Sequence, residues 1–204
     1  MLRQVSRIFV FFLGILPLSA FAQQAPAFDC AKAESSAEKL VCSDPKLGLL
    51  DQRLAKRFSA ALAVAQSQDE EGTEAENLLR ATQRGWISGR DECWKEPDLE
   101  ACVRQSYLRR EAELVARYLL EEPVSVQTFV CEGGAADTFV AYQFNTEMTA
   151  IRFERGDTVA AGALLSSDKP QEFYLANAGN VSFAGDQAVF SDPYGAEQSC
   201  QLAK

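Results

Sequence analysis

The chain has 204 residues, of which 29 are acidic and 20 are basic, and it contains no histidine, so its formal net charge at pH 7 is −9. Histidine is the usual general base and the usual activator of a serine or cysteine nucleophile, so its absence excludes Ser-His-Asp and Cys-His arrangements. So acidic a protein repels nucleic acid and anionic membranes and attracts basic partners. Paired carboxylates can act together in glycosidases, but none stands here in a recognisable motif.

The first residues are typical of a secretory signal peptide, which is removed from the mature protein. Arg3 and Arg7 supply positive charge, an apolar run covers residues 8–18, and residues 20–22 form a small-x-small cleavage site, Ala-Phe-Ala. The apolar run is shorter than the roughly 20 residues that a spanning helix needs, although a retained N-terminal anchor is the alternative. Removal of the two arginines changes the net charge to −9 − 2 = −11. We therefore expect residues 1–22 to be a signal peptide and the mature protein to be periplasmic or secreted, without a stable membrane anchor.

The cysteines are typical of a disulfide framework, because their number is even and the chain is predicted to be exported. Sequence alone does not fix how they pair. Their spacing favours three pairs among the six: Cys30 with Cys42, Cys93 with Cys102, and Cys131 with Cys200. A metal site is the alternative, but zinc sites use Cys-x-x-Cys pairs or histidine ligands, and this sequence has neither. We expect no metal and no cofactor.

Composition divides the rest of the chain into a helical part and a β part. Residues 23–122 are rich in Ala, Leu, Glu, Arg and Lys, whereas residues 123–204 are rich in Val, Phe, Thr, Gly and Ser. Pro123 ends the preceding helix, because proline lacks the backbone N–H that a helix interior needs. We predict an α+β protein of two domains: a disulfide-stapled helical domain over 23–122 and a small antiparallel β-barrel over 123–204.

Capping residues and apolar periodicity predict the helices in chain order. Ser35 and Glu38 form a capping box, and Asp44 precedes a proline at the first position of the second helix. A second capping box, Thr73 with Glu76, opens a third helix after an acidic loop. Apolar residues at helical spacing mark the buried face of the second helix: Leu47, Leu50, Leu54, Phe58 and Leu62.

A last helix is predicted to start at Pro97, and one charged residue interrupts its apolar stripe. Arg110 stands at a position where the spacing predicts an apolar side chain. The stem of an arginine can pack on a core while its head reaches solvent or a carboxylate, and we favour this interpretation over a binding role. The rest of the stripe is Leu99, Val103, Tyr107, Leu114 and Tyr118.

Short runs of β-branched and aromatic residues follow, separated by turn residues. The predicted strands are 126–131, 138–144, 149–153, 158–161, 172–175, 181–183, 188–190 and 199–202. Short strands with regular turns are typical of a small antiparallel barrel or sandwich. A disulfide between Cys131 and Cys200 would tie the first strand to the last, which suits closure into a barrel.

A series of short motifs runs in order through the predicted helices. They are Phe28-Asp29-Cys30, Glu38-Lys39-Leu40-Val41-Cys42, Leu47, Leu50-Asp51, Gln83-Arg84, Trp86-Ile87, Arg90-Asp91, Cys93, Cys102, Tyr107, Arg110 and Leu114. Together they resemble the N-terminal domain of the LprI-type lysozyme-inhibitor family, over residues 28–114. The resemblance implies an exported, small helical domain with paired disulfides. It also suggests lysozyme inhibition, although many members of that family have no established role.

The β part carries a second set of motifs: Phe129-Val130-Cys131-Glu132-Gly133-Gly134, Gly185-Asp186-Gln187-Ala188 and Ser199-Cys200. They resemble the MliC-type inhibitors of c-type lysozyme, which are small eight-stranded barrels with a cysteine near each end. In that family a Ser-Gly-x-x-Tyr loop and a lysine before the Gly-Asp turn enter the lysozyme cleft and engage its catalytic carboxylates. By this resemblance, the partner-binding candidates are Ser166, Ser167, Asp168, Lys169, Tyr174, Gly185 and Asp186.

This chain departs from the MliC-type pattern in both places. Its loop has no Ser-Gly pair, and Ala184 stands where that family has lysine. A lysine facing a carboxylate contributes a charge-assisted hydrogen bond of about 1.5–3 kcal/mol, which alanine cannot supply. Lys169 is a candidate substitute from the other loop, and the alternative is that these are ordinary polar loop residues.

The sequence therefore predicts a protein that acts by binding and is not an enzyme. We expect it to occlude the cleft of a basic c-type lysozyme or another muramidase. The alternative is an envelope binding or assembly module that does not inhibit, which the altered loop favours. A glycan hydrolase that uses paired carboxylates is a third, weaker hypothesis.

Overall fold

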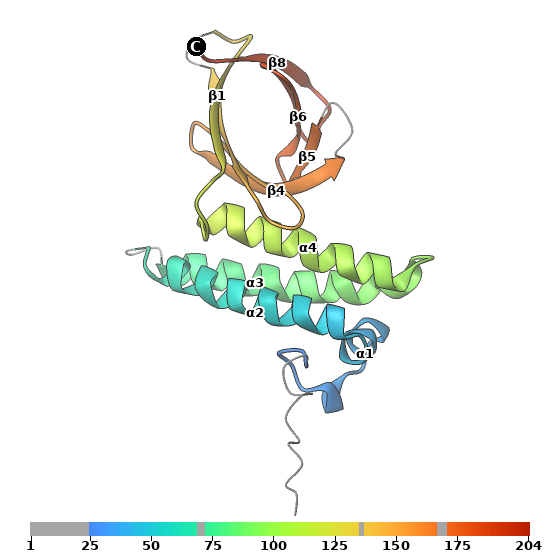
Figure 1. Ribbon diagram of the computed structural model, residues 1–204. Coiled ribbons are helices and arrows are strands. Elements are labelled where there is room, and N and C mark those ends of the chain that lie inside the picture. Colours follow the sequence, from blue (N-terminus) through green and yellow to red (C-terminus); the bar gives the residue numbers. More distant parts are fainter. Residues whose placement is uncertain (1–24, 69–71, 135–136, 167–170) are drawn as a thin grey trace, which may run out of the picture.

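The computed structural model describes residues 25–68, 72–134, 137–166 and 171–204, and for Ser166 only the backbone. A helical layer is followed by a β-barrel, and α4 lies between the other helices and the barrel (Figure 1). The helical elements are η1 (Cys30–Lys32), α1 (Ser36–Ser43), α2 (Pro45–Gln66), α3 (Gly72–Asp91), η2 (Glu92–Lys95) and α4 (Leu99–Tyr118). Within the described ranges, each helix is too short or too polar to cross a membrane.

The first two helices begin at the predicted caps. Ser35 Oγ accepts a hydrogen bond from the backbone N of Glu38 at 3.0 Å, and Glu38 Oε2 accepts one from the backbone N of Ser35 at 3.1 Å. Asp44 Oδ1 accepts from the backbone N of Lys46, and Pro45 is the first residue of α2. These side chains satisfy N–H groups that lack a partner within the helix.

The predicted starts of the other two helices are wrong. Because α3 already includes Gly72, Thr73 lies inside the first turn, and Glu76 instead accepts hydrogen bonds from side chains of Gln66 and Arg80. The last helix begins at Leu99 rather than Pro97, with Asp98 Oδ1 accepting from the backbone N of Ala101 at 2.9 Å. An N-cap needs a side-chain acceptor, which aspartate has and proline lacks.

The helices share one apolar core, and two disulfides fasten its periphery. The Cys30–Cys42 bridge joins η1 to α1, and the Cys93–Cys102 bridge joins η2 to α4, both as predicted. The predicted face of α2 packs into this core, with Leu47, Leu50 and Leu54 buried and Phe58 and Leu62 partly buried.

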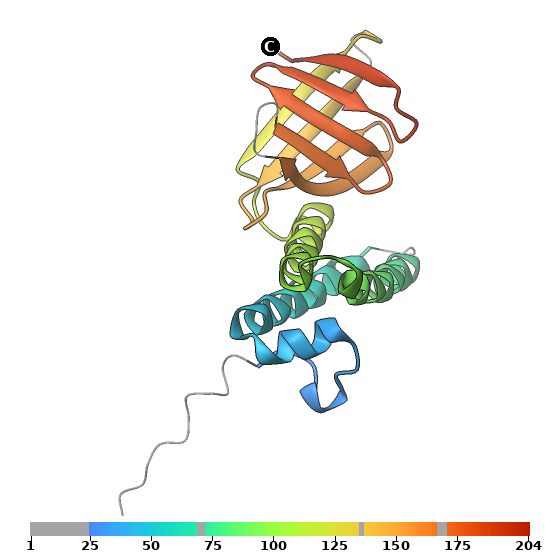
Figure 2. The ribbon, with the colours of Figure 1, turned by 90° about the vertical axis from the view of Figure 1, so that its right-hand side faces the viewer.

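The strands form a closed antiparallel barrel, in which each strand pairs with the next and β1 pairs with β8 (Figure 2). The fold is therefore α+β, as predicted. The Cα atoms of Cys131 and Cys200 face each other at 3.9 Å in the β1–β8 register, and their sulfurs form the third predicted disulfide. The strands are β1 (Ser125–Cys131), β2 (Thr138–Phe144), β3 (Ala150–Arg155), β4 (Thr158–Ser166), β5 (Gln171–Leu175), β6 (Gly179–Ala184), β7 (Gln187–Ser191) and β8 (Glu197–Leu202).

Alternate residues of each strand face the interior, which aromatic rings fill. Phe139 lies between Phe129 and Phe153, with ring centroids 5.0 and 4.8 Å away. The ring visible in Figure 1 is therefore a packed core, as expected for a barrel of eight strands.

The outer face of β2, β3 and β4 packs against α4. Small residues make this contact close, because alanine side chains let the helix and the sheet approach. The buried residues are Ala112, Val115 and Ala116 of α4 with Phe144, Ala150, Ala161 and Ala163 of the strands. The composition boundary at residue 122 falls in the connection between α4 and β1.

Candidate functional site

The strand register brings part of the predicted partner-binding set to one end of the barrel. Gln171 pairs with Phe183 and Ala184 pairs with Gln187, so the β4–β5 connection and the β6–β7 turn lie at the same end. Asp186 is exposed in that turn, after Gly185, whose φ of 62° suits glycine. Ser166 ends β4 at this same end. The candidates Ser167, Asp168 and Lys169 lie outside the described residues.

Tyr174 is set apart from the rest of that set. It lies on the outer face of β5, pairs with Asn180 and is 43 % exposed. It lies three positions after Gln171 along the strand, a distance of about 10 Å. The structure therefore does not bring Tyr174 to the same end as Gly185 and Asp186.

The arginines in the described part of the barrel are already paired with carboxylates, so they offer a binding partner little unpaired positive charge. Arg152 pairs with Glu154 at 2.5 Å and donates to the backbone oxygen of Arg117. Arg155 pairs with Asp137 at 2.6 Å and also donates to a glutamine. The only lysine among the described barrel residues is Lys204, the last residue of the sequence.

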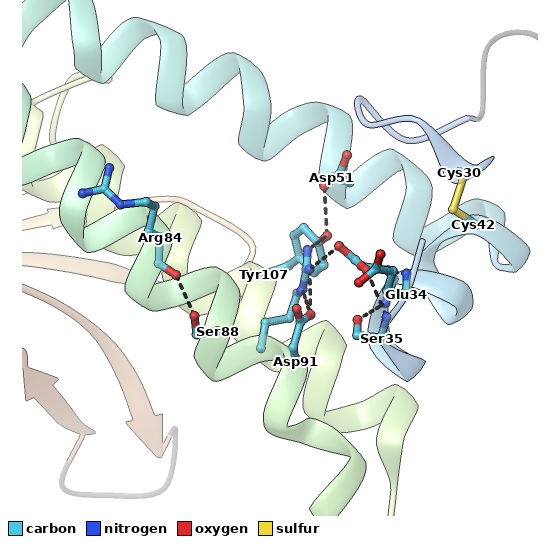
Figure 3. A network of polar contacts seen from close by, with 11 residues as sticks. Cys30, Glu34, Ser35, Cys42, Asp51, Arg84, Ser88, Asp91 and Tyr107 are labelled. Atoms are coloured by element: carbon cyan, nitrogen blue, oxygen red, sulfur yellow. Dashed lines mark hydrogen bonds and ion pairs between the residues drawn. A yellow bond between two sulfur atoms is a disulfide. The ribbon is translucent and has the colours of Figure 1, made fainter. Parts of the chain in front are cut away.

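A second candidate place lies in the helical layer, around a buried arginine near the end of α3. Arg90 is only 4 % exposed. Its Nη1 donates to the Tyr107 hydroxyl at 2.9 Å, and its Nη2 donates to Asp91 Oδ1 at 2.7 Å. The Tyr107 hydroxyl in turn donates to Asp51 Oδ1 at 2.9 Å, so one chain of hydrogen bonds links α3, α4 and α2 (Figure 3).

Aromatic contacts and a third carboxylate complete this network. The Trp86 ring meets the Tyr107 ring edge-on with centroids 5.2 Å apart, and the guanidinium carbon of Arg90 lies 5.4 Å from the Trp86 centroid. Glu38 Oε1 lies 3.8 Å from Arg90 Nη2 and brings in α1. The buried cation is thus surrounded by carboxylates and aromatic faces, as a buried charge requires.

The environment shifts the pKa of three groups in the network. Burial raises the pKa of the Tyr107 hydroxyl, and the nearby Asp51 carboxylate raises it further. Burial opposes the charged form of Arg90, but Tyr107 and Asp91 outweigh it, so the pKa of Arg90 is raised. Backbone N–H groups of Glu34 and Ser35 lower the pKa of Glu38. These directions keep the tyrosine neutral and the arginine charged, which stabilises the helical fold and suggests no acid–base role.

The structure confirms that the stem of Arg110 packs on the core while its charged head reaches a carboxylate. The side chain is buried, and its Nη1 lies 2.9 Å from Glu113 Oε2. Its Nε donates to Gln83 Oε1 at 3.0 Å. Two of the motif positions quoted above therefore contact each other, and their role is to satisfy a buried charge.

Two surface depressions flank the network, and Trp86 and Arg90 line both. The smaller, of ≈ 240 Å³, is also lined by Phe28, Phe58 and Ile87. The larger, of ≈ 690 Å³, runs along α4 from Ala101 to Glu113. Its further lining includes the Cys93–Cys102 bridge, Pro97, Ala101, Gln105 and Arg109.

Sequence reasoning missed these depressions. The available signal was weak: Gln83, Trp86 and Arg90 recur at helical spacing on α3, whose sequence is otherwise polar. The apolar stripe singled out Arg110, and nothing in the sequence pointed to its neighbour Arg109. Within the described ranges, no group of three or more Asp, Glu, Cys or His side chains is placed to hold a metal ion.

Comparison with known proteins gives a consistent result over the helical part. The family model described as "Lysozyme inhibitor LprI" matches residues 30–152. The proteins named "Lipoprotein LprI" of Mycobacterium tuberculosis (strains H37Rv and CDC 1551) and Mycobacterium bovis are 30% identical over 163 residues, covering 74% of this chain and 78% of theirs. No solved structure matches the chain.

The matched region locates the shared sequence on the molecule. It contains the whole Arg90 network, the larger depression, and the smaller depression except for Ala27 and Phe28. It ends inside β3, before the β4–β5 connection and the β6–β7 turn. The resemblance of the barrel to MliC-type inhibitors therefore stays a prediction. Over residues 30–152, the chain belongs to the LprI family of lysozyme inhibitors.

Proposed function

We propose that this protein is an exported lysozyme inhibitor that binds the enzyme and occludes its active-site cleft, without catalysis of its own. Family membership supports the target, and the name "Lipoprotein LprI" of its relatives supports a place in the cell envelope. The signal-peptide pattern of residues 1–22 supports a periplasmic or secreted location. In this proposal residues 23–122 and 123–204 are two domains, and the first carries the main site.

One observation carries the proposal. Six of the motif residues, although spread along the chain, meet in one network beside two depressions: Glu38, Asp51, Trp86, Arg90, Asp91 and Tyr107. The network fixes α1, α2, α3 and α4 relative to one another. A surface that is rigid before binding loses less conformational entropy in the complex, which suits an inhibitor that must hold its target.

Charge supports a basic target. The formal net charge of −9 speeds encounter with a basic enzyme, more than it strengthens the final complex. Glycosidases of the lysozyme type carry a pair of carboxylates in the cleft, so a bound protein there blocks the substrate directly. The partner-binding candidates named from the sequence are proposed as a second contact: Ser166, Ser167, Asp168, Lys169, Tyr174, Gly185 and Asp186.

The test is a titration of the purified full chain into an assay of bacterial cell-wall lysis by c-type lysozyme. We expect lysis to fall with dose and to stop falling near equimolar inhibitor, because one surface covers one cleft. An unrelated protein of similar net charge serves as the control for non-specific attraction. Absence of both inhibition and complex formation with every lysozyme class tested would rule the proposal out.

A non-inhibitory envelope binding module is the second candidate. The observation that favours it is Ala184 at the position where MliC-type inhibitors have lysine, next to the exposed turn. The same titration separates the two, because such a module would form a complex, or none, without slowing lysis.

A further inference from the structure

We propose that the lysozyme-binding face covers η2 and α4 as far as Arg109, that Trp94 and Arg109 are its main contacts, and that Arg109 binds a carboxylate of the enzyme. This inference rests on the proposed function and names the surface that performs it. The partner is a muramidase that presents an acidic side chain beside apolar surface.

Trp94 is the first observation. It lies in η2, directly after the disulfide-bonded Cys93, and is 61 % exposed, whereas the other tryptophan, Trp86, is packed against Tyr107. Among the residues that the structure describes, its one ring contact is with the neighbouring Lys95, whose Nζ lies 5.4 Å from the ring centroid. Tryptophan and arginine are the residues most enriched among those that dominate binding energy at protein interfaces. An exposed tryptophan held on a bridged turn is therefore a candidate anchor.

Arg109 is the second observation. It is exposed on α4 and lines the larger depression. Its neighbours on the helix are engaged: Arg104 pairs with Glu147, and Arg110 pairs with Glu113. Among the described residues no carboxylate pairs with Arg109, and the one a turn away, Glu113, is taken. The planar guanidinium is suited to bidentate binding of a carboxylate from outside.

The surroundings favour a carboxylate next to apolar surface. The depression that Arg109 lines has an apolar part, formed by Pro97, Ala101 and the Cys93–Cys102 bridge. Three carboxylates also line it: Glu113 is paired with Arg110, Asp98 caps α4, and Glu96 is the third. Apolar walls exclude water from a bound partner, which strengthens an ion pair at their edge. Beneath them, Arg90 and Tyr107 hold the helices in place.

The position leaves room for a large partner. The 20 residues of α4 extend over about 30 Å, and the barrel is joined to its far end. In Figure 1 the start of α4 reaches beyond the barrel, on the side away from the connection to β1. A globular enzyme can therefore approach η2 and the start of α4 without displacing the strands.

The test compares Trp94→Ala and Arg109→Glu with two matched controls in the full chain. Tyr194→Ala removes an aromatic side chain that is 96 % exposed on the barrel, and Lys56→Glu makes the same charge change on α2. We expect each of the first two variants to raise the concentration for half-inhibition of lysis by about tenfold or more. We expect the controls to change it less than about twofold.

The design separates this inference from the proposed function. Arg109→Glu makes the chain more acidic, so non-specific attraction to a basic enzyme would increase, and only a specific contact explains a loss. Circular dichroism melting must stay unchanged in both variants, and Arg109→Lys is expected to recover part of the inhibition. Inhibition by the wild type that survives in both variants overturns this inference alone. No inhibition by the wild type overturns the proposed function and this inference with it.

Discussion

The helical layer and the barrel differ in the kind of side chain that they bury. Three charged side chains are buried among the described residues, and all lie on helices: Arg90, Arg110 and Glu111. The buried set of the barrel is apolar and dominated by phenylalanine. A core with charges depends on a few directional contacts, whereas an aromatic core depends on volume.

This contrast explains where the family motifs lie. A buried guanidinium needs partners at fixed positions, so residue identity matters at Asp51, Trp86, Arg90 and Tyr107. An apolar interior accepts many residues of similar volume. The helical part therefore carries a recognisable signature, and the barrel carries mainly a pattern of alternation.

The largest effect is expected from removing the charge at the centre of the helical network. Arg90→Met leaves Asp91 and the Tyr107 hydroxyl without their partner, and we expect the free energy of unfolding to fall by about 3–5 kcal/mol. Urea unfolding followed by tryptophan fluorescence measures it. As a control, Arg80→Met removes the exposed pair with Glu76 and should change stability by less than about 1 kcal/mol. Equal losses in the two variants would contradict a structural role for the network.

The disulfides provide the next comparison. The bridge Cys131–Cys200 closes a segment with a sequence separation of 69, and Cys93–Cys102 one of 9. If a disulfide stabilises by restricting the unfolded chain, the bridge that closes the longer loop contributes about 4 kcal/mol to stability and the other about 3 kcal/mol. In one variant for each bridge, both cysteines are replaced by serine. The loss of stability measured by thermal unfolding should follow that order. The reverse order would show that local packing, rather than loop length, decides the contribution.

A smaller effect is expected from one hydroxyl. Tyr107→Phe leaves Asp51 Oδ1 and one N–H of Arg90 unpaired in a buried place, at a cost of about 1–3 kcal/mol. The matched variant in the barrel, Tyr142→Phe, removes a partly buried bond to Glu154 and should lie below about 1 kcal/mol. Both are measured by urea unfolding. Indistinguishable results would mean that the two hydroxyls have equivalent surroundings.

The smallest effect concerns the contact between the two parts. Glu147, in the β2–β3 connection, pairs with Arg53 of α2 at 2.9 Å and also with Arg104 of α4. These side chains are well exposed, so Glu147→Gln should reduce stability by at most about 1 kcal/mol, and the loss should disappear at high salt. Unfolding at low and high salt tests this. A loss that persists at high salt would show that the contact is not mainly electrostatic.

The sequence predicted the helices and strands better than the side-chain contacts between them. Strand alternation and turn residues located all the strands, and cysteine spacing gave the three bridges. The Arg90 network could not be predicted, because it joins residues as far apart as Asp51 and Tyr107, and helix packing decides which of them meet. Helical spacing placed Arg110 on the buried stripe and left Arg109 outside it, and one step of about 100° around the helix buries the first and exposes the second. The spacing could not show that Gln83 and Glu113 are the partners of Arg110.

The most direct test of the account is hydrogen exchange of the full chain with and without bound c-type lysozyme, read by mass spectrometry. We predict that binding slows exchange in peptides from residues 92–113, which contain η2 and the first 15 of the 20 residues of α4. Slowing confined to residues 164–187 of the barrel would contradict the assignment of the binding face to the helical layer.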